Sequence, residues 1–421
     1  MCEVKQTFDR KNKLQENFMN LSFPLLLDGA MGTQLYKRGF PAGDCPEKWS
    51  LEHPEEVLSI QRAYVNAGSR ILYAPTFGAN SSVLEKNGVF NQVKDYNQRL
   101  VALAREAAGG KAFVAGDISS TGAMLYPLGD ASFEDLFTVY REQAEALEEA
   151  GVDLFVIETM TNIPEARAAL LAVKSVSDKP VFVSFTCNEA GRTMTGTDVA
   201  AALLILQGMG ADAFGLNCSV GPQEMIPQLR RLAELAEVPL LAKPNAGLPK
   251  SAGFQTVYDV SAEEFASFVP TLAEAGVSIF GGCCGTDEAY IAALKKELSS
   301  VTLKTPEHTS SDLLPCASER DVFLLPPDAS YAEVFPCDEE LEDALTEAEK
   351  GELIAVSIQT EEDLAVFSDC QYAVSNPLCI LCDDADLLER TLRAYQGRAL
   401  YEGSLPDEAL LPLAQKYGLI F

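Results

Sequence analysis

The sequence predicts an eight-stranded α/β barrel followed by a small C-terminal α/β appendage. Between residues 20 and 300, a short apolar run, a turn containing Gly or Asn and an amphipathic helix follow one another repeatedly. The apolar runs are almost continuous and rich in Val, Ile, Leu and Phe, which is typical of parallel strands buried on both faces. No GxGxxG turn follows the first run, so a doubly wound dinucleotide-binding sheet is the weaker alternative.

Eight predicted strands occupy residues 24–29, 69–76, 112–117, 152–159, 180–187, 211–218, 238–245 and 277–282. The segments between them have helical period. After Ser132, for example, Phe133, Leu136, Phe137, Tyr140 and Leu147 fall on one helix face. Ser261 followed by Glu264 is a capping-box pattern that predicts a helix before the last strand. Strands that alternate with helices run parallel, and eight such units close a (β/α)8 TIM barrel.

The chain divides into four predicted segments. These are a polar N-terminal extension (1–20), the barrel (21–300), a polar linker containing proline (301–315) and a small α/β segment (316–421). The last segment contains a few strand–helix patterns but is too short for a second barrel. Its Cys379 and Cys382 form a CxxC inside an apolar run without a second ligand pair, so we interpret them as core residues.

Composition and charge exclude several function classes. The formal net charge is −30, from 62 acidic and 32 basic residues, and such a surface repels phosphate backbones and anionic lipid. We therefore expect neither nucleic acid nor membrane as a partner. The N-terminal residues lack an apolar signal segment, and the apolar runs are only strand-sized, which together predict a cytoplasmic protein with reduced cysteines. Only two histidines occur, so chemistry built on histidine is not expected.

Polar side chains gather where the predicted strands end, which in such barrels is the face that carries the active site. They are Asp28, Thr76, Asp117, Glu158, Cys187, Asn217, Cys218, Asn245, Cys283 and Cys284.

Three of these residues predict a metal site. Cys218 ends strand six and the Cys283–Cys284 pair ends strand eight. Adjacent residues on a strand point to opposite faces, but glycines at 281, 282 and 285 allow the backbone to leave strand geometry and turn both sulfurs inward. Three soft thiolates favour Zn²⁺ and leave its fourth position open. The alternatives are a strained disulfide between neighbours or inert core cysteines, and neither needs the bracketing glycines.

The ligand set also indicates the chemistry. Three thiolates leave zinc with a net charge of −1, which makes it a weak activator of water and argues against hydrolysis. A zinc deaminase would need the H-x-E…P-C-x-x-C signature, which the chain lacks. A substrate thiol, by contrast, binds as a thiolate and stays electron-rich enough to accept a methyl group. No catalytic residue is then expected beyond the zinc-activated substrate thiolate. A Schiff-base aldolase using Lys243 is an alternative that leaves the cysteines unexplained.

Six motifs resemble the homocysteine S-methyltransferase family, which includes the homocysteine-binding module of cobalamin-dependent methionine synthase. They are DGAMGTQL (28–35), TFGAN (76–80), IET (157–159), NCSVGP (217–222), PNAGLP (244–249) and GGCCGT (281–286). The resemblance implies that Cys218, Cys283 and Cys284 bind zinc and that Asp28 and Glu158 hold the substrate ammonium. It also implies that backbone amides after strand one, at Gly29 and Ala30, bind the substrate carboxylate. Asn217 is a further candidate substrate contact, although Asn217 and Asn245 could instead tie down loops.

Two loops depart from the methionine-synthase pattern, and both lie near the predicted substrate mouth. The sequence reads APTFGAN where Asn more often precedes Thr76, and ISSTG where Gly-Pro usually precedes Thr121. Either change could alter acceptor affinity or donor docking.

The methyl donor remains open between three hypotheses. Residues 377–400 resemble part of a pterin-binding domain, with Asp-Asp where Asp-Ser is common, and no D-x-H-x-x-G cobalamin signature occurs. The first hypothesis is therefore methylcobalamin on a separate corrinoid protein, or a donor derived from methyltetrahydrofolate. The second is a small sulfonium or betaine donor such as S-methylmethionine. The third is a zinc- and thiol-binding module without turnover.

Overall fold

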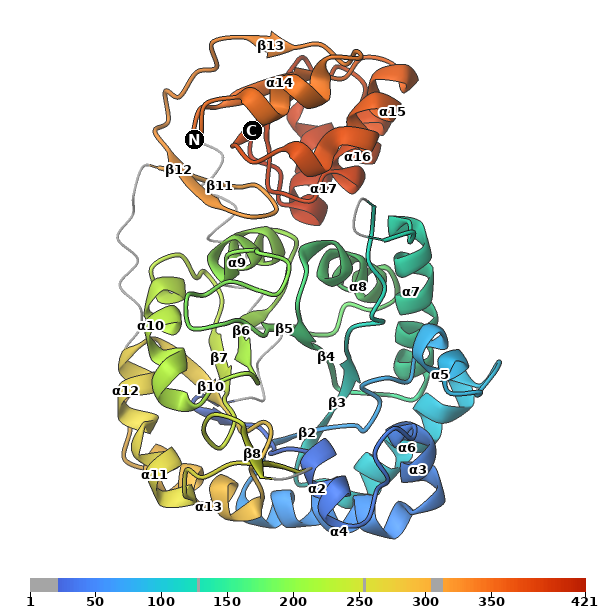
Figure 1. Ribbon diagram of the computed structural model, residues 1–421, viewed down its shortest axis with the longest axis vertical. Helices are drawn as coiled ribbons and strands as arrows, with labels where there is room; N and C mark the ends of the chain where they lie inside the picture. The colour runs from blue at the N-terminus through green and yellow to red at the C-terminus, as the bar shows by residue number, and fades with distance from the viewer. Residues whose placement is uncertain (1–21, 127–128, 253–254, 304–312) are drawn as a thin grey trace.

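The barrel predicted from the sequence is present in the computed structural model, which describes residues 22–126, 129–252, 255–303 and 313–421. Eight parallel strands form a ring in the order β1-β10-β7-β6-β5-β4-β3-β2 (Figure 1). They are β1 (Leu25–Leu26), β2 (Ile71–Tyr73), β3 (Phe113–Ile118), β4 (Leu154–Met160), β5 (Val181–Phe185), β6 (Ala213–Asn217), β7 (Leu240–Lys243) and β10 (Val277–Phe280). The amide of Arg70 donates to the Leu26 carbonyl (2.7 Å) and joins the two ends of the sheet. Six of these strands lie within their predicted ranges, and β3 and β4 each extend one residue further, so the fold class is confirmed.

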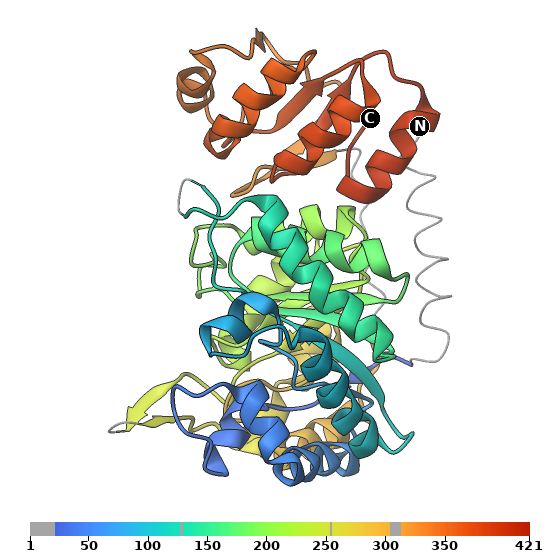
Figure 2. The same ribbon diagram turned by 90° about the vertical axis from the view of Figure 1, so that its right-hand side faces the viewer.

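Helices surround this ring on the outside (Figure 1). They are α2 (Gly32–Lys37), α3 (Pro46–Glu52), α4 (Pro54–Ala67), α5 (Ser81–Lys86), α6 (Val93–Ala108), α7 (Phe133–Glu149), α8 (Ile163–Val176), α9 (Val199–Gly208), α10 (Pro222–Ala233), α11 (Ala262–Ser267), α12 (Val269–Glu274) and α13 (Glu288–Leu298). A hairpin of β8 (Lys250–Ala252) and β9 (Gln255–Val257), which the sequence reading missed, projects from the barrel between β7 and α11 (Figure 2).

Helix boundaries follow their capping residues. Ser132 and Asp135 form a capping box at the start of α7, as two reciprocal side-chain-to-backbone hydrogen bonds. The predicted helix start at Ser261 is also present, because its hydroxyl accepts from the amide of Glu264 (3.2 Å). That helix ends at Ser267, and α12 continues after a break. Pro270 in the first turn of α12 has no amide hydrogen to continue α11, which explains the break.

The barrel buries two apolar layers. Inside the ring, side chains such as Leu27, Tyr73, Val156 and Leu241 form one cluster. Alternate strand residues, such as Phe155, pack outward against the helices in a second cluster. This alternation determines which residues at the strand ends point to the interior.

The C-terminal unit is a separate layered structure. Its parallel sheet has the order β13-β14-β15-β16, and Figure 2 shows its helices against one face. Its elements are β11 (Leu314–Ala317), β12 (Val322–Leu325), β13 (Val334–Phe335), α14 (Leu341–Glu347), β14 (Ile354–Ser357), α15 (Glu361–Cys370), η1 (Gln371–Ala373), β15 (Leu378–Leu381), α16 (Ala385–Ala394), β16 (Leu400–Glu402) and α17 (Asp407–Tyr417).

The antiparallel hairpin β11–β12 covers the sheet's other face, where Cys316 and Leu325 pack with Ala355 and Cys379. Cys379 and Cys382 are both buried, as predicted for core residues. The hairpin was not predicted, and β11 begins at Leu314, inside the predicted linker 301–315. The predicted extension 1–20 and most of that linker lie outside the described residues.

A buried arginine joins the two parts. The C-terminal unit lies against α8 and α9 (Figures 1 and 2). From α8, the fully buried Arg167 donates to the Leu392 carbonyl (2.7 Å) and the Gln396 side chain (2.7 Å). Carbonyls in the last turn of a helix have no partner within the helix, so Arg167 caps α16 from the barrel side. A second contact runs from Arg192 to Asp321 (2.7 Å). Among the residues the structure describes, no helix combines the length and apolar character needed to cross a membrane.

Candidate metal centre

The three predicted cysteine ligands meet at the mouth of the barrel. The sulfur atoms of Cys218, Cys283 and Cys284 all lie within 4.8 Å of one another, and Cys218 Sγ and Cys284 Sγ are 3.8 Å apart. Cys218 follows β6 directly, whereas the pair lies in a turn after β10. All ten cysteines of the described chain are free thiols, so the alternative of a disulfide between neighbours is not seen there.

Glycines shape the turn that carries the cysteine pair, as the sequence predicted. A Cβ added at Gly282 would lie 2.5 Å from Thr286 Oγ1, and Gly285 has a φ of +87°. Any larger residue would therefore clash or be strained. An unpredicted feature is the backbone of Cys218 and Ser219, whose φ values are +61° and +59°. Residues other than glycine adopt this conformation rarely, and they do so mainly at functional sites.

The segment after β7 holds both cysteine loops in place. The amide of Cys218 donates to the Lys243 carbonyl (3.1 Å), and that of Cys283 donates to the Pro244 carbonyl (2.8 Å). The Cys284 carbonyl accepts from the amide of Ala246 (2.9 Å). One strand end thus fixes ligands that are 66 positions apart in the sequence.

The start of α2 supports the cysteine turn from the opposite side. Thr33 Oγ1 accepts from the amide of Gly285 (3.2 Å), and the Gln34 side chain donates to the Thr286 carbonyl (3.0 Å). The DGAMGTQL and GGCCGT motifs therefore contact each other directly.

The chemistry of the trio fits a soft dication. Hydrogen bonds from Cys283, then from Cys284, lower the pKa of the Cys218 thiol to about 3. The same interaction with Cys218 raises the pKa of Cys284 to about 11. Asn245 Oδ1 is buried and has no hydrogen-bond partner within the described chain. Three convergent thiols suit a soft bound cation, and an all-sulfur donor set favours zinc.

The two predicted ammonium-binding carboxylates are placed differently. Asp28 Oδ2 accepts from the amide of Tyr73 (2.8 Å), and Asp28 Oδ1 accepts from Lys243 Nζ (3.1 Å). Glu158 Oε2 lies 3.8 Å from Lys243 Nζ and is buried without a hydrogen-bond partner in the described residues. Both oxygens of Asp28 are thus engaged, whereas Glu158 keeps an oxygen available.

The predicted carboxylate-binding amides lie beside the cysteine turn. The amide of Ala30 donates to Thr286 Oγ1 (3.2 Å), and a Cβ at Gly29 would lie 2.8 Å from the Tyr64 ring. In this structure the Ala30 amide therefore fixes the turn.

Asn217 ties three strands together. Its Oδ1 accepts from the amide of Thr159 (2.9 Å) and from Ser184 Oγ (2.9 Å), and its Nδ2 donates to Thr159 Oγ1 (2.7 Å). The side chain is only 1% exposed. Of the two roles considered for Asn217, this arrangement favours loop tying over substrate contact.

The sequence suggested only a Schiff-base role for Lys243, and its place among the buried carboxylates was not predicted. It is 3% exposed, and its Nζ lies 3.6 Å from the centroid of the Tyr73 ring. Burial opposes its charge, but Asp28 and then Glu158 raise its pKa well above the usual value. A protonated amine has no lone pair for a Schiff base, so the aldolase alternative is not supported. The two-residue strand period could have revealed Lys243, because Leu241 points into the barrel and Lys243 follows it on the same side.

Buried carboxylates anchor the two loops that depart from the family pattern. In the ISSTG loop, Glu165 accepts from the amide of Thr121 (2.6 Å) and from Ser120 Oγ (2.7 Å). In the APTFGAN loop, Glu47 accepts from the amide of Gly78 (2.7 Å). These loops are therefore held by specific hydrogen bonds despite their altered sequence.

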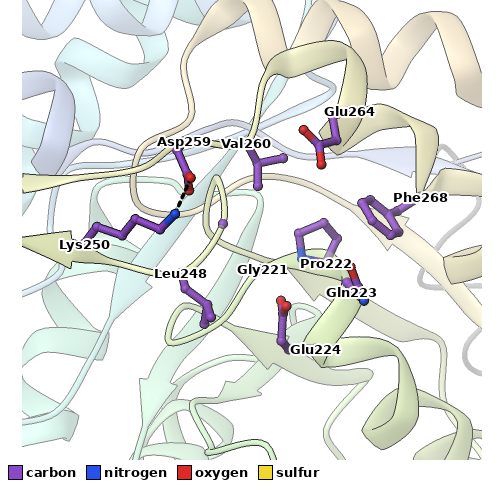
Figure 3. A pocket seen from close by; sticks show the side chains of 11 residues that line it. Gly221, Pro222, Gln223, Glu224, Leu248, Lys250, Asp259, Val260, Glu264 and Phe268 are labelled. Carbon is purple, nitrogen blue, oxygen red and sulfur yellow. Dashed lines mark hydrogen bonds and ion pairs between the residues drawn. The ribbon is translucent and has the colours of Figure 1, made fainter.

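A cavity of about 170 Å³ lies between the start of α10 and the loop after β7 (Figure 3). The N-terminal end of α10, the loop after β7 and the start of α11 line it, and Figure 3 shows the Lys250–Asp259 ion pair at one side. None of the three cysteines lines this cavity, which separates it from the sulfur trio.

Comparisons with known proteins agree with the geometry. A sequence model of the homocysteine S-methyltransferase family matches residues 25–298. Methionine synthase from Mycobacterium tuberculosis is 32% identical over 305 residues, which cover 68% of this chain and 25% of that protein. Methionine synthase from Mycobacterium leprae is 33% identical over 285 residues, which cover 63% of this chain and 23% of that protein. The chain thus spans about a quarter of the length of these curated relatives.

A solved structure shares the same barrel. The homocysteine methyltransferase MmuM from Escherichia coli, in its oxidised form, is 26% identical with a TM-score of 0.57, and the match covers 67% of this chain and 99% of that one. Its metallated form matches with a TM-score of 0.56 over the same shares. Because the family match extends over more than half of the sequence and includes all three cysteines, the chain belongs to the homocysteine S-methyltransferase family.

Proposed function

We propose that this protein transfers a methyl group to the thiol of homocysteine, forming methionine, and that Cys218, Cys283 and Cys284 hold a Zn²⁺ ion for this reaction. The observation that carries the proposal is the convergence of the three sulfurs within 4.8 Å at the barrel mouth. Zinc, when bound, supplies one function: it lets the substrate thiol lose its proton at neutral pH. Three protein ligands also leave one tetrahedral position for that thiol.

The chain's own residues bind and orient the substrate in this proposal. Glu158 receives the ammonium group of homocysteine, because its buried Oε2 has no hydrogen-bond partner among the described residues. The segment at Gly29 and Ala30 lies beside the cysteine turn, so we assign the substrate carboxylate to it, and the carboxylate then replaces Thr286 Oγ1 as the acceptor of the Ala30 amide. Methyl transfer to a thiolate needs no general acid on the acceptor side, so no further catalytic residue is assigned.

The donor we propose is methylcobalamin on a separate corrinoid protein. The similarity to two methionine synthases supports it. A small sulfonium or betaine donor is the second candidate, because the similarity to MmuM covers 99% of that chain. The family match ends at residue 298, so the resemblance of residues 316–421 to part of a pterin-binding domain stays a prediction.

The test is a donor assay with purified, zinc-loaded full-length protein. Homocysteine is combined separately with methylcobalamin, methyltetrahydrofolate, S-methylmethionine and betaine, and methionine is measured by mass spectrometry. We expect methionine from methylcobalamin and its loss after chelation of the metal. Activity with S-methylmethionine alone would establish the second donor instead. Binding of homocysteine without methionine from any donor would overturn the proposed turnover and support a binding module.

A further inference from the structure

We infer that Lys243 is the internal counter-ion of Asp28 and that this pairing reserves Glu158 for the ammonium group of the substrate. The inference rests on the proposed function and assigns different roles to two carboxylates that the family resemblance treats alike. Lys243 is then a positioning residue that acts through the carboxylates and does not touch the substrate.

Distances around the Lys243 ammonium distinguish the two carboxylates. Nζ lies 3.1 Å from Asp28 Oδ1, which is a hydrogen bond, but 3.8 Å from Glu158 Oε2, which is beyond hydrogen-bond range. The remaining oxygen of Asp28 accepts from the amide of Tyr73 (2.8 Å). Asp28 is thus paired within the protein, and Glu158 Oε2 is left as a buried acceptor without a hydrogen bond. Buried polar atoms without a partner are rare in folded proteins, so this one needs an explanation.

The charges in the barrel interior give the same assignment. Within the described part of the chain, Asp28, Asp117 and Glu158 face one cation, Lys243, whose Nζ sits over the Tyr73 ring. Burial, and then the charge of Glu158, raises the pKa of Asp117 well above its usual value, which favours its neutral form. Asp28 and Lys243 cancel each other. Glu158, at 3.8 Å from the same ammonium, is the less closely paired of the two carboxylates and is the one we assign to the incoming ammonium group.

Without Lys243, two carboxylates would share one small buried space. Neighbouring like charges destabilise each other, so one of the two would bind a proton or compete for the substrate cation. A buried lysine that neutralises Asp28 removes this ambiguity before the substrate arrives. The rival view is that Asp28 contacts the substrate ammonium directly and that Lys243 is displaced on binding.

An experiment that removes the two charges, first singly and then together, separates these views. Asp28→Asn keeps an oxygen acceptor for the Tyr73 amide but frees Lys243 to pair with Glu158. The double variant Asp28→Asn/Lys243→Met removes both charges and restores the balance. Each protein is loaded with Co²⁺, and the change in the cobalt–thiolate absorption is titrated with L-homocysteine. The matched ligand is 4-mercaptobutyrate, which has the same thiol and carboxylate but no amine.

We expect Asp28→Asn to weaken homocysteine binding about tenfold, within the range of couplings between contacting charges. The double variant should return to within about threefold of the parent, because Glu158 is again unpaired. Binding of 4-mercaptobutyrate should change little in either variant, which a general distortion of the metal centre would not allow. Glu158→Gln serves as the positive control for a lost ammonium contact.

A double variant as weak as Asp28→Asn would overturn the inference, since Asp28 would then contact the substrate itself. If the single variant does not fold, the double variant still decides. An affinity for homocysteine near that of the parent supports the inference. A loss of affinity for homocysteine, but not for 4-mercaptobutyrate, contradicts it. An unchanged cobalt spectrum with both thiols in the parent protein would overturn the proposed function itself. That outcome is distinct from a failure of the Lys243 assignment.

Discussion

The barrel and the C-terminal unit are built from the same kind of strand–helix unit, yet only the barrel gathers reactive groups. Both contain several cysteines. In the closed ring, strand ends that are distant in sequence meet at one mouth, and three sulfurs come within 4.8 Å. The C-terminal sheet has four strands in sequential order and is covered by a hairpin, so Cys379 lies in its core. Closure of the sheet, and not cysteine content, therefore brings the three sulfurs of the candidate metal centre together.

The largest expected effect comes from replacing a cysteine of the trio. Cys283→Ser should lose the bound zinc and lower methionine formation by about a thousandfold or more, because a serine hydroxyl is a poor ligand for a thiophilic ion. Metal analysis and the donor assay measure both. Cys379→Ser in the C-terminal unit is the matched control and should retain zinc. Stoichiometric zinc in the Cys283 variant would contradict the assignment of this residue as a ligand.

The second prediction concerns thiol reactivity in the metal-free protein. Cys218 has its pKa lowered to about 3, whereas burial raises that of Cys379 to about 12 and that of Cys187 to about 11. The thiolate is the reactive form and prevails above the pKa. At pH 7 the Cys379 thiol is about 10⁵-fold less ionised than Cys218, but the low-pKa thiolate of Cys218 is about 10⁴-fold less nucleophilic. Iodoacetamide should therefore modify Cys218 about tenfold faster than Cys379, and the burial of Cys379 should widen this difference.

Peptide mapping by mass spectrometry gives the rates. Between pH 6 and 9 the Cys218 rate should stay nearly constant, while the slower thiols react faster as the pH rises. Zinc should protect Cys218. Equal labelling of Cys218 and Cys379 would contradict the lowered pKa of Cys218.

The third prediction tests how firmly the two regions are joined. Arg167→Ala should lower the free energy of unfolding by about 3 kcal/mol, because it leaves helix carbonyls of α16 buried without donors. Urea denaturation measures the change. Arg390→Ala removes an exposed ion pair with Glu361 within the C-terminal unit and should have no measurable effect. Equal stability of the Arg167 variant and the parent would show that this contact does not hold the unit in place.

The smallest effects should be the same in both regions. Ser132 caps α7 in the barrel, and Thr360 caps α15 in the C-terminal unit, each in a capping box. Replacing either residue by alanine should cost about 1 kcal/mol, because one amide at the helix start loses its acceptor. Thermal unfolding of the two variants provides the comparison. A much larger loss at only one site would show that its cap also supports tertiary contacts.

Local patterns determined which elements form. The apolar runs predicted all eight barrel strands, and the Ser261 cap predicted the start of α11. The hairpin β8–β9 was missed because its strands are three residues long and lack an apolar run. The hairpin β11–β12 was missed although β12 is the apolar run VFLL, because no strand–helix repeat surrounds it. The role of Asn217 stayed open for a different reason. Its partners Thr159 and Ser184 belong to other strands, and only the packed sheet brings them within hydrogen-bond distance.

The sequence by itself determined the barrel, the three cysteines at its strand ends and the glycines that let two adjacent sulfurs turn inward. These features depend on periodicity and on the conformational freedom of residues near one another in the chain. Only the tertiary structure decided that Lys243 lies 3.1 Å from Asp28 and that Glu158 keeps a free oxygen. The charge balance joins Lys243 to three carboxylates that lie on or just after other strands, at Asp28, Asp117 and Glu158. It depends on distances across a closed ring, and those distances exist only after the ring has formed.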